Sequence, residues 1–144
     1  MDLHVREAVP ADAETIVALI RDLAATDGAT SPLTADYAAA YLSAPGVCVL
    51  LAEDAGQALG LLSYCVRANL YHAGDCCVID ELVVREDARG RGVGSALMRA
   101  VVSRAQAAGC AEISVSTMPD NARAIAFYRQ HGFTDEAVYL EQHF

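Results

Sequence analysis

Residues 83–97 read VVREDARGRGVGSAL and pass from an apolar strand, through an arginine- and glycine-rich turn, into an amphipathic helix. The first turn of a helix presents unpaired backbone N–H groups and the positive end of the helix dipole, so it attracts anions. Three glycines at alternate positions let the backbone approach a phosphate closely, and Arg89 and Arg91 add charge-assisted donors. The stretch therefore predicts a site for a phosphate-bearing cofactor.

Two widespread phosphate-binding motifs do not fit this loop. Its glycines follow G-x-G-x-G, whereas a dinucleotide fingerprint requires G-x-G-x-x-G near the start of a βαβ unit, and Ser95 occupies the third glycine position here. A P-loop requires a lysine, and all ten cationic side chains of this chain are arginines.

The pattern that fits is Arg-x-x-Gly-x-Gly, formed by Arg89, Gly92 and Gly94. Together with the preceding strand Glu81–Val84, it resembles the acetyl-CoA pyrophosphate loop of the GNAT superfamily of N-acetyltransferases. A second segment, residues 121–133, reads NARAIAFYRQHGF and is similar to that family's N-x-x-[AS]-x-x-[FL]-Y-x-x-x-G-F motif. The two segments follow the family's order and spacing, and the resemblance covers about residues 76 to 133.

The order of expected elements predicts a mixed α/β sheet in a single domain, residues 1–144. Apolar periodicity and turn residues predict strands at 3–8, 47–52, 58–66, 76–85, 112–117 and 137–144, and helices at 10–26, 34–45, 92–108 and 119–131. The GNAT resemblance implies the rest: a mostly antiparallel twisted sheet, flanked by about four helices, whose fourth and fifth strands splay apart to form the cofactor cleft.

The same resemblance implies acetyl-CoA as cosubstrate. It implies that the cofactor is held by the backbone of the fourth strand, by the loop and by the start of the next helix, which gives as cofactor-binding residues Leu82, Val83, Val84, Arg89, Gly90, Arg91, Gly92, Val93, Gly94, Ser95 and Asn121. Residues 82–84 also fit a plain core strand, since a strand's side chains can be core while its backbone binds. Asn121 also fits the N-cap of the following helix.

Tyr128 matches the family tyrosine that protonates the departing thiolate. A phenol with a pKa of about 10 is protonated at neutral pH and can donate to a thiolate whose pKa is about 8.5. Apart from the motif, a helical tyrosine beside Phe127 fits the core equally.

The acceptor amine must lose a proton before attack, and Glu81 is the candidate base. It lies directly before Leu82, and apolar neighbours would raise its pKa toward the useful range. Strict strand alternation puts its neighbour Asp80 on the opposite sheet face. A substrate-binding or structural role for Glu81, proton transfer through water alone, and His72 in the 69–74 connection are the alternatives.

The amino-acid composition limits the classes of binding partner. A net charge of −9 argues against a nucleic-acid partner, although the same acidity could simply keep the protein soluble. No apolar run is long enough for a membrane span, and five cysteines without C-x-x-C spacing favour a reduced, cytoplasmic setting. No metal is expected, because adjacent Cys76 and Cys77 on a strand face opposite ways.

The expected reaction is direct attack of a small-molecule primary amine on acetyl-CoA in a ternary complex. Acetylation of a protein or peptide, and an acyl-CoA-binding sensor without catalysis, remain alternatives. The expected acceptor-binding elements are residues 20–45 and 64–75, and Arg21 and Arg67 are the only cations near them. This favours polyamine, aminoglycoside or amino-acid-like amines at least as much as aminoalkylphosphonates. Because dimers are common in the family, the apolar C-terminal strand is a candidate contact for a homodimer.

Overall fold

The computed structural model describes residues 1–144, and its centre is a five-stranded sheet in the order β1-β2-β3-β4-β5. The strands are β1 (His4–Glu7), β2 (Val47–Asp54), β3 (Gln57–Asn69), β4 (Gly74–Val84) and β5 (Glu112–Val115). Neighbours from β1 to β4 pair antiparallel, and β5 joins β4 in parallel. The predicted mixed, mostly antiparallel sheet is confirmed.

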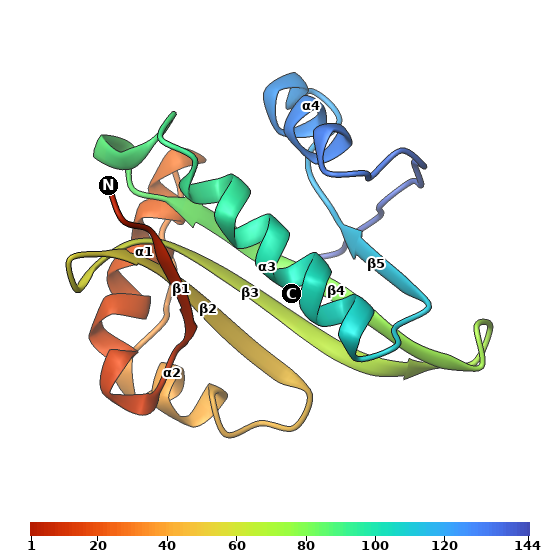
Figure 1. Ribbon diagram of the computed structural model, residues 1–144, viewed down its shortest axis with the longest axis horizontal. Coiled ribbons are helices and arrows are strands. Elements are labelled where there is room, and N and C mark those ends of the chain that lie inside the picture. The colour runs from red at the N-terminus through yellow and green to blue at the C-terminus, as the bar shows by residue number, and fades with distance from the viewer.

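Four α-helices accompany the sheet: α1 (Ala13–Thr26), α2 (Ala35–Tyr41), α3 (Val93–Ala107) and α4 (Ala122–Gln130). Short 3₁₀ turns precede α1 at Pro10–Asp12 and follow β4 at Glu86–Ala88. Helix α3 lies across one face of the sheet, α1 and α2 cover the other, and α4 stands beyond β5 (Figure 1). No helix is both long and apolar enough to cross a bilayer.

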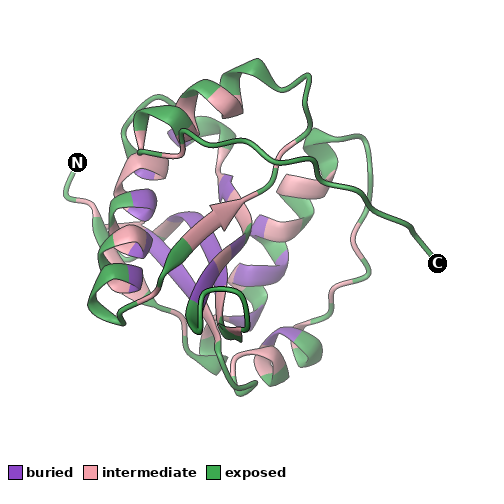
Figure 2. Cartoon of the chain, turned by 90° about the vertical axis from the view of Figure 1, so that its right-hand side faces the viewer, coloured by how far each residue is buried: buried purple, intermediate pink, exposed green.

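The hairpin β2–β3 supplies the centre of the core because both of its faces are covered. Leu50 and Leu62 pack under α3, whereas Leu51 and Leu61 pack under α1 and α2, and all four side chains are at most 1% exposed. Figure 2 shows this buried centre inside a more exposed periphery. The strands connect through Ala55 and Gly56, both at positive φ, as a two-residue turn between antiparallel strands requires.

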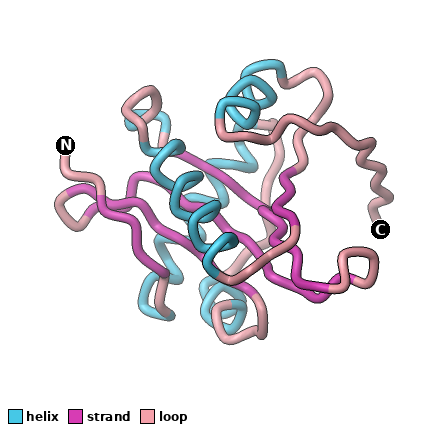
Figure 3. The backbone as a smooth tube through the Cα atoms, turned by 45° about the vertical axis from the view of Figure 1, so that its right-hand side comes forward, coloured by secondary structure: helices cyan, strands magenta, loops and turns pink.

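Strands β4 and β5 pair over only four residues of each strand. Cys76 to Ile79 face Glu112 to Val115, and β5 then ends, so residues 80–84 of β4 have no strand partner on that side. Figure 3 shows the two strands diverging toward α4. The predicted splay of the fourth and fifth strands is therefore present.

Side-chain and glycine caps set most helix ends close to the predicted positions, but α2 ends at Tyr41 and does not run to residue 45. The Thr34 hydroxyl accepts from the Tyr37 N–H at 3.1 Å, and Gly109 at φ +74° follows the last turn of α3. Helix α4 begins at Ala122 rather than at Pro119, because Asn121 caps it by accepting from the Ala124 N–H at 3.1 Å.

The predicted strand at 137–144 is wrong. These residues form loop throughout (Figure 3) and run away from the buried centre (Figure 2). No backbone hydrogen bond involves residues 134–144, and Val138, Leu140 and Phe144 are largely exposed. Alternating apolar residues are not enough for a strand, because a strand also needs a partner for its backbone groups.

Gly46 provides a test of the packing between the α2–β2 connection and β3. It has φ +76°, and a Cβ there would lie 2.7 Å from the Val66 carbonyl oxygen, which is rigid backbone. We expect Gly46→Ala to lower the free energy of unfolding by about 2 to 4 kcal/mol, the sum of the positive-φ penalty and overpacking.

The matched control is Gly56→Ala, because Gly56 also has φ +76° but a Cβ there meets nothing within 4 Å. This variant should lose only about 1 to 2 kcal/mol. Urea unfolding followed by circular dichroism measures both values. Equal losses would mean that the contact with Val66 contributes nothing.

Candidate active site

The glycine-rich loop leads directly into α3 and leaves the first turn of that helix open. Gly92 is the N-cap residue at φ +83°, and the first helical hydrogen bond runs from the Ala96 N–H to the Gly92 carbonyl at 3.0 Å. The N–H groups of Val93, Gly94 and Ser95 donate to no other group of the chain. A Cβ added at Gly92 meets nothing within 4 Å, so the backbone is accessible from outside. These features fit a pyrophosphate group.

Two of the five arginines between residues 85 and 104 are already paired with carboxylates. Arg85 contacts Asp87 at 2.6 Å, and Arg104, near the far end of α3, contacts Glu7 at 2.6 Å. The exposed Arg89 donates from Nε to the Val84 carbonyl oxygen at 3.3 Å, and Arg91 forms no ion pair. Arg89 and Arg91 are therefore the loop cations available to an anionic ligand.

The last residues of β4 expose backbone groups toward the splay. The Arg85 N–H donates to Leu59 of β3 at 2.9 Å. Because N–H groups alternate along a strand, Val83 also faces β3, whereas Leu82 and Val84 direct theirs toward the gap left by β5. The side chain of Val83 is 4% exposed in the core under α1. Thus Leu82 and Val84 offer free edge donors, and Val83 combines core packing with pairing to β3.

A β-bulge sets the direction of Glu81. Ser63 of β3 pairs with Glu81 and Tyr64 pairs with Ile79, so Asp80 is an extra residue between them. Ile79 packs under α3; strict alternation would place Glu81 on that face too, but the bulge moves it to the α1/α2 face. The expectation that Asp80 and Glu81 lie on opposite faces fails because it assumed an uninterrupted strand.

The Ser63 hydroxyl and partial burial hold Glu81, by one hydrogen bond to its carboxylate and one from its backbone N–H. Its Oε1 accepts from the Ser63 hydroxyl at 2.9 Å, and the Glu81 N–H donates to the same hydroxyl oxygen at 3.0 Å. Burial raises the pKa of Glu81, the nearby charge of Asp80 raises it further, and the bond from Ser63 opposes both. The net result is a Glu81 pKa above the usual value of a glutamate, which makes the carboxylate a better proton acceptor.

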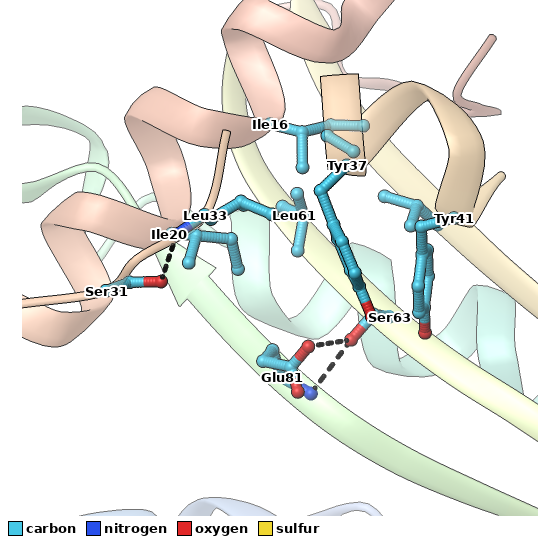
Figure 4. Close-up of a pocket in the computed structure, with 11 residues that line it drawn as sticks. Ile16, Ile20, Ser31, Leu33, Tyr37, Tyr41, Leu61, Ser63 and Glu81 are labelled. Atoms are coloured by element: carbon cyan, nitrogen blue, oxygen red, sulfur yellow. Dashed lines mark hydrogen bonds between the residues drawn. The ribbon is translucent and has the colours of Figure 1, made fainter. Parts of the chain in front are cut away.

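Glu81 lies at one end of a pocket of about 270 Å³ on the α1/α2 face of the sheet (Figure 4). The polar lining residues are Ser31, Ser63 and Glu81. The apolar and aromatic ones come from α1, the loop after it, α2, β2 and β3, and are Ile16, Ile20, Leu33, Tyr37, Ala38, Tyr41, Val49 and Leu61. Of the two expected acceptor elements, 20–45 supplies six of the lining residues, whereas 64–75 supplies none. Both elements miss Ile16, Val49, Leu61 and Ser63.

The two tyrosines of α2 point with their hydroxyl ends toward Ser63 and Glu81 (Figure 4). Burial raises the pKa of Tyr41 to about 12, and the charges of Glu81 and Asp80 add to this effect. Tyr41 therefore stays protonated at neutral pH. Helix α2 falls within the acceptor element expected at 20–45, but Tyr37 and Tyr41 were not singled out from sequence, because a helical tyrosine there carries no motif that separates pocket lining from core.

Tyr128 lies on α4, across the splay from β4. Its ring is 5.5 Å from the Phe127 ring and 6.1 Å from the Phe133 ring, measured between centroids, and both contacts are edge-on. Burial raises the pKa of Tyr128, which keeps the phenol protonated. Its hydroxyl forms no hydrogen bond with another side chain.

Sequence reasoning missed a contact that joins α4 to the phosphate loop. The Ser95 hydroxyl lies 3.2 Å from His131 Nε2, and the His131 ring is 4.8 Å from Phe127. Burial lowers the pKa of His131, and the charge of Arg99 lowers it further. The contact fixes the distance between the start of α3 and the end of α4, which border the splay.

His72 does not line the pocket. It lies at the tip of the β3–β4 hairpin, where Nε2 contacts Glu112 Oε2 at 2.8 Å. The pocket carboxylate is at position 81, seven residues along β4 from Gly74, which is about 23 Å at the usual strand rise. No group of three or more metal-ligating side chains is assembled in the chain.

Comparison with known proteins decides the family. The model of the acetyltransferase (GNAT) family matches residues 16–133, which is most of the chain. This chain belongs to the GNAT family. A solved structure described as a transcriptional regulator from Bacillus halodurans C-125 superposes with a TM-score of 0.87 at 26% identity, covering 99% of this chain and 100% of that one.

The curated relatives differ in how much of their own length this chain matches. The aminoalkylphosphonate N-acetyltransferase of Salmonella typhimurium is 30% identical over 90% of this chain and 84% of its own length. An uncharacterized Bacillus subtilis protein, YdhI, is 31% identical over 60% of this chain. That match covers 49% of the length of YdhI. The GNAT chain described here is thus an acetyltransferase by family, with small-molecule acetylation among its relatives.

The glycine loop allows a direct test of the cosubstrate site. We expect Gly92→Val to weaken acetyl-CoA binding about tenfold or more, because a branched side chain stands before the free N–H groups of α3; a tenfold loss is about 1.4 kcal/mol. Gly109→Val is the matched control, since Gly109 also has positive φ and open surroundings but lies at the other end of α3. Calorimetric titration measures both affinities, and equal affinities would remove the loop from the binding site.

Proposed function

We propose that this GNAT protein is a single-domain, acetyl-CoA-dependent N-acetyltransferase that acetylates the primary amine of a small molecule by direct attack in a ternary complex. The observation that carries the proposal is the position of β4 between two sites. The edge N–H groups of Leu82 and Val84 border the splay, and Glu81, the residue before them, lines the pocket on the α1/α2 face. An amine at Glu81 is therefore adjacent to whatever the edge of β4 holds.

The residues that would hold acetyl-CoA fit its chemistry. The free N–H groups of α3, with Arg89 and Arg91, suit the pyrophosphate, and the β4 edge suits the amide groups of the pantetheine arm. When bound, acetyl-CoA supplies an acetyl group activated as a thioester. The exposed Asn121 uses Oδ1 as the helix cap, which leaves its amide NH₂ free to donate to the same arm.

Three groups of the chain then act on the proton of the amine, the carbonyl oxygen and the departing sulfur. Glu81 accepts the proton of the ammonium group at its carboxylate, directly or through a water. The N–H of Leu82 donates to the carbonyl oxygen on which negative charge develops. Tyr128 donates its phenolic proton to the departing sulfur, and its raised pKa keeps that proton in place until then.

The five unpaired cysteines support a cytoplasmic setting, because an oxidising compartment would favour disulfides. The exposed apolar side chains within residues 137–144 would form the contact of a homodimer.

The alternative of a protein or peptide acceptor is less favoured, since a pocket of about 270 Å³ suits a small molecule better than an open chain. The sensor alternative leaves Glu81 and Tyr128 without a role.

The test is incubation with acetyl-CoA and a panel of polyamines, aminoglycosides, amino acids, aminoalkylphosphonates, simple alkyl and aryl amines, and short peptides. Mass spectrometry detects the acetylated products and avoids interference from the protein's own thiols. Acetylation of a small amine is the expected result. Acetyl-CoA binding without any product would favour the sensor, and a product only from peptides would favour the protein acceptor.

A further inference from the structure

The charge distribution of the pocket beside Glu81 limits which acceptors the pocket can bind. Of the residues that line it, Glu81 is the only charged one, and most of the others are aliphatic or aromatic. Ser63 is engaged with Glu81, and the Ser31 hydroxyl accepts from the Leu33 N–H at 3.2 Å (Figure 4). The pocket thus offers one site for a cation and an apolar wall beyond it.

The two arginines nearest in the sequence do not supply an anion site. Arg21 follows Ile20 on α1 but is exposed and does not line the pocket. Arg67 is exposed toward the hairpin end of β3, and its charge acts on the Asp80 carboxylate. Neither arginine contributes to the pocket wall, so an acceptor's anionic group would find no cationic partner there.

An anionic group in this pocket would be disfavoured twice. It would lose water and gain no cationic partner, only the neutral hydroxyls of Ser31, Tyr37 and Tyr41, and it would lie near the negative charge of Glu81. An apolar or aromatic group would instead release water from the side chains of Ile20, Leu33 and Tyr37.

We propose that the acceptor is a primary amine whose remaining part is apolar or aromatic and carries no anionic group. Its ammonium end lies at Glu81 and Ser63, and its body lies against α1, Leu33 and the α2 tyrosines. This inference rests on the proposed function and narrows its substrate class. It also separates this chain from the Salmonella relative, whose name specifies an aminoalkylphosphonate.

Matched acceptor pairs test the inference on the intact protein with acetyl-CoA. One pair is phenylalaninamide and phenylalanine, and the other is butylamine and 3-aminopropylphosphonate; the main difference within each pair is the anionic group. With rates referred to free amine, kcat/KM for the uncharged member should be at least about tenfold higher in both pairs. Equal or higher values for the anionic members would overturn the inference and leave N-acetylation standing.

A charge placed in the pocket provides the second arm. Tyr37 lines the pocket but is 65% exposed, so Tyr37→Arg adds a cation there with little disturbance of the core. This variant should reduce the preference for the uncharged amines about tenfold or reverse it. Ala40→Arg, an exposed position of α2 outside the pocket, is the control and should keep the wild-type preference. The same shift in both variants would mean that overall charge, and not the pocket, sets the preference.

Calorimetric binding of the four amines to the protein saturated with coenzyme A separates this inference from the proposed function. Tighter binding of the uncharged amines without any acetylated product would support the pocket inference and refute the transferase proposal. Acetylation without higher affinity and efficiency for the uncharged amines would support the transferase proposal and refute the pocket inference.

Discussion

Tyr128→Phe is expected to lower kcat about a hundredfold or more, because the departing sulfur then leaves without a proton donor. The affinity for acetyl-CoA should change less than about threefold, since a phenylalanine ring keeps the packing against Phe127 and Phe133. Steady-state kinetics with the best acceptor and calorimetric titration of acetyl-CoA measure the two quantities.

Tyr71→Phe is the matched control for this result. Tyr71 lies at the tip of the β3–β4 hairpin and is 92% exposed, so loss of its hydroxyl should leave kcat unchanged. Because burial raises the pKa of Tyr128, the wild-type enzyme should keep its activity up to alkaline pH. A Tyr128→Phe enzyme with wild-type kcat would exclude the tyrosine as proton donor and leave it as a packing residue.

Glu81→Gln is expected to lower kcat/KM about a hundredfold at neutral pH, since an amide cannot take the proton from the ammonium group. The fold should hold, because the glutamine oxygen still accepts from the Ser63 hydroxyl. Thermal unfolding of the variant checks that point. Wild-type efficiency in this variant would favour proton loss through water alone.

The dependence of kcat/KM on pH tests separately whether Glu81 is the base. A base works when ionised, so kcat/KM should fall as the pH drops below the raised pKa of Glu81, and this break should vanish in Glu81→Gln. Asp80→Asn is the companion variant. Because the Asp80 charge raises the pKa of Glu81, its removal should shift the break to lower pH with little effect on the plateau. An unshifted break would assign it to another group, such as the acceptor amine.

The backbone of the glycine-rich loop, where the family resemblance places acetyl-CoA, could be predicted from the sequence because its determinants are local. The loop depends on Gly92 at positive φ and on the start of α3, and both follow from residues within a few positions of each other. Asn121 caps α4 for the same reason. The splay of β4 and β5 came from the family resemblance, since no local pattern states where a parallel pair of strands ends.

The acceptor side could be predicted only in outline. Glu81 was expected at the cleft, but its face depends on a bulge whose register is set between β3 and β4. The tail at 137–144 has the apolar pattern of a strand, yet no strand of this chain pairs with it. His72 was placed near the pocket by its position in a connection, whereas the length of the hairpin carries it away to Glu112.

The sequence alone therefore determined the glycine-rich start of α3 and the helix caps, because backbone preferences and nearest-neighbour hydrogen bonds act over short stretches of chain. The role expected of Tyr128 came from the family resemblance. Only the tertiary structure decided that Glu81 faces the α1/α2 side and that no arginine reaches its pocket. Both depend on strand register and on packing between α1, α2 and the sheet, which join residues distant in sequence.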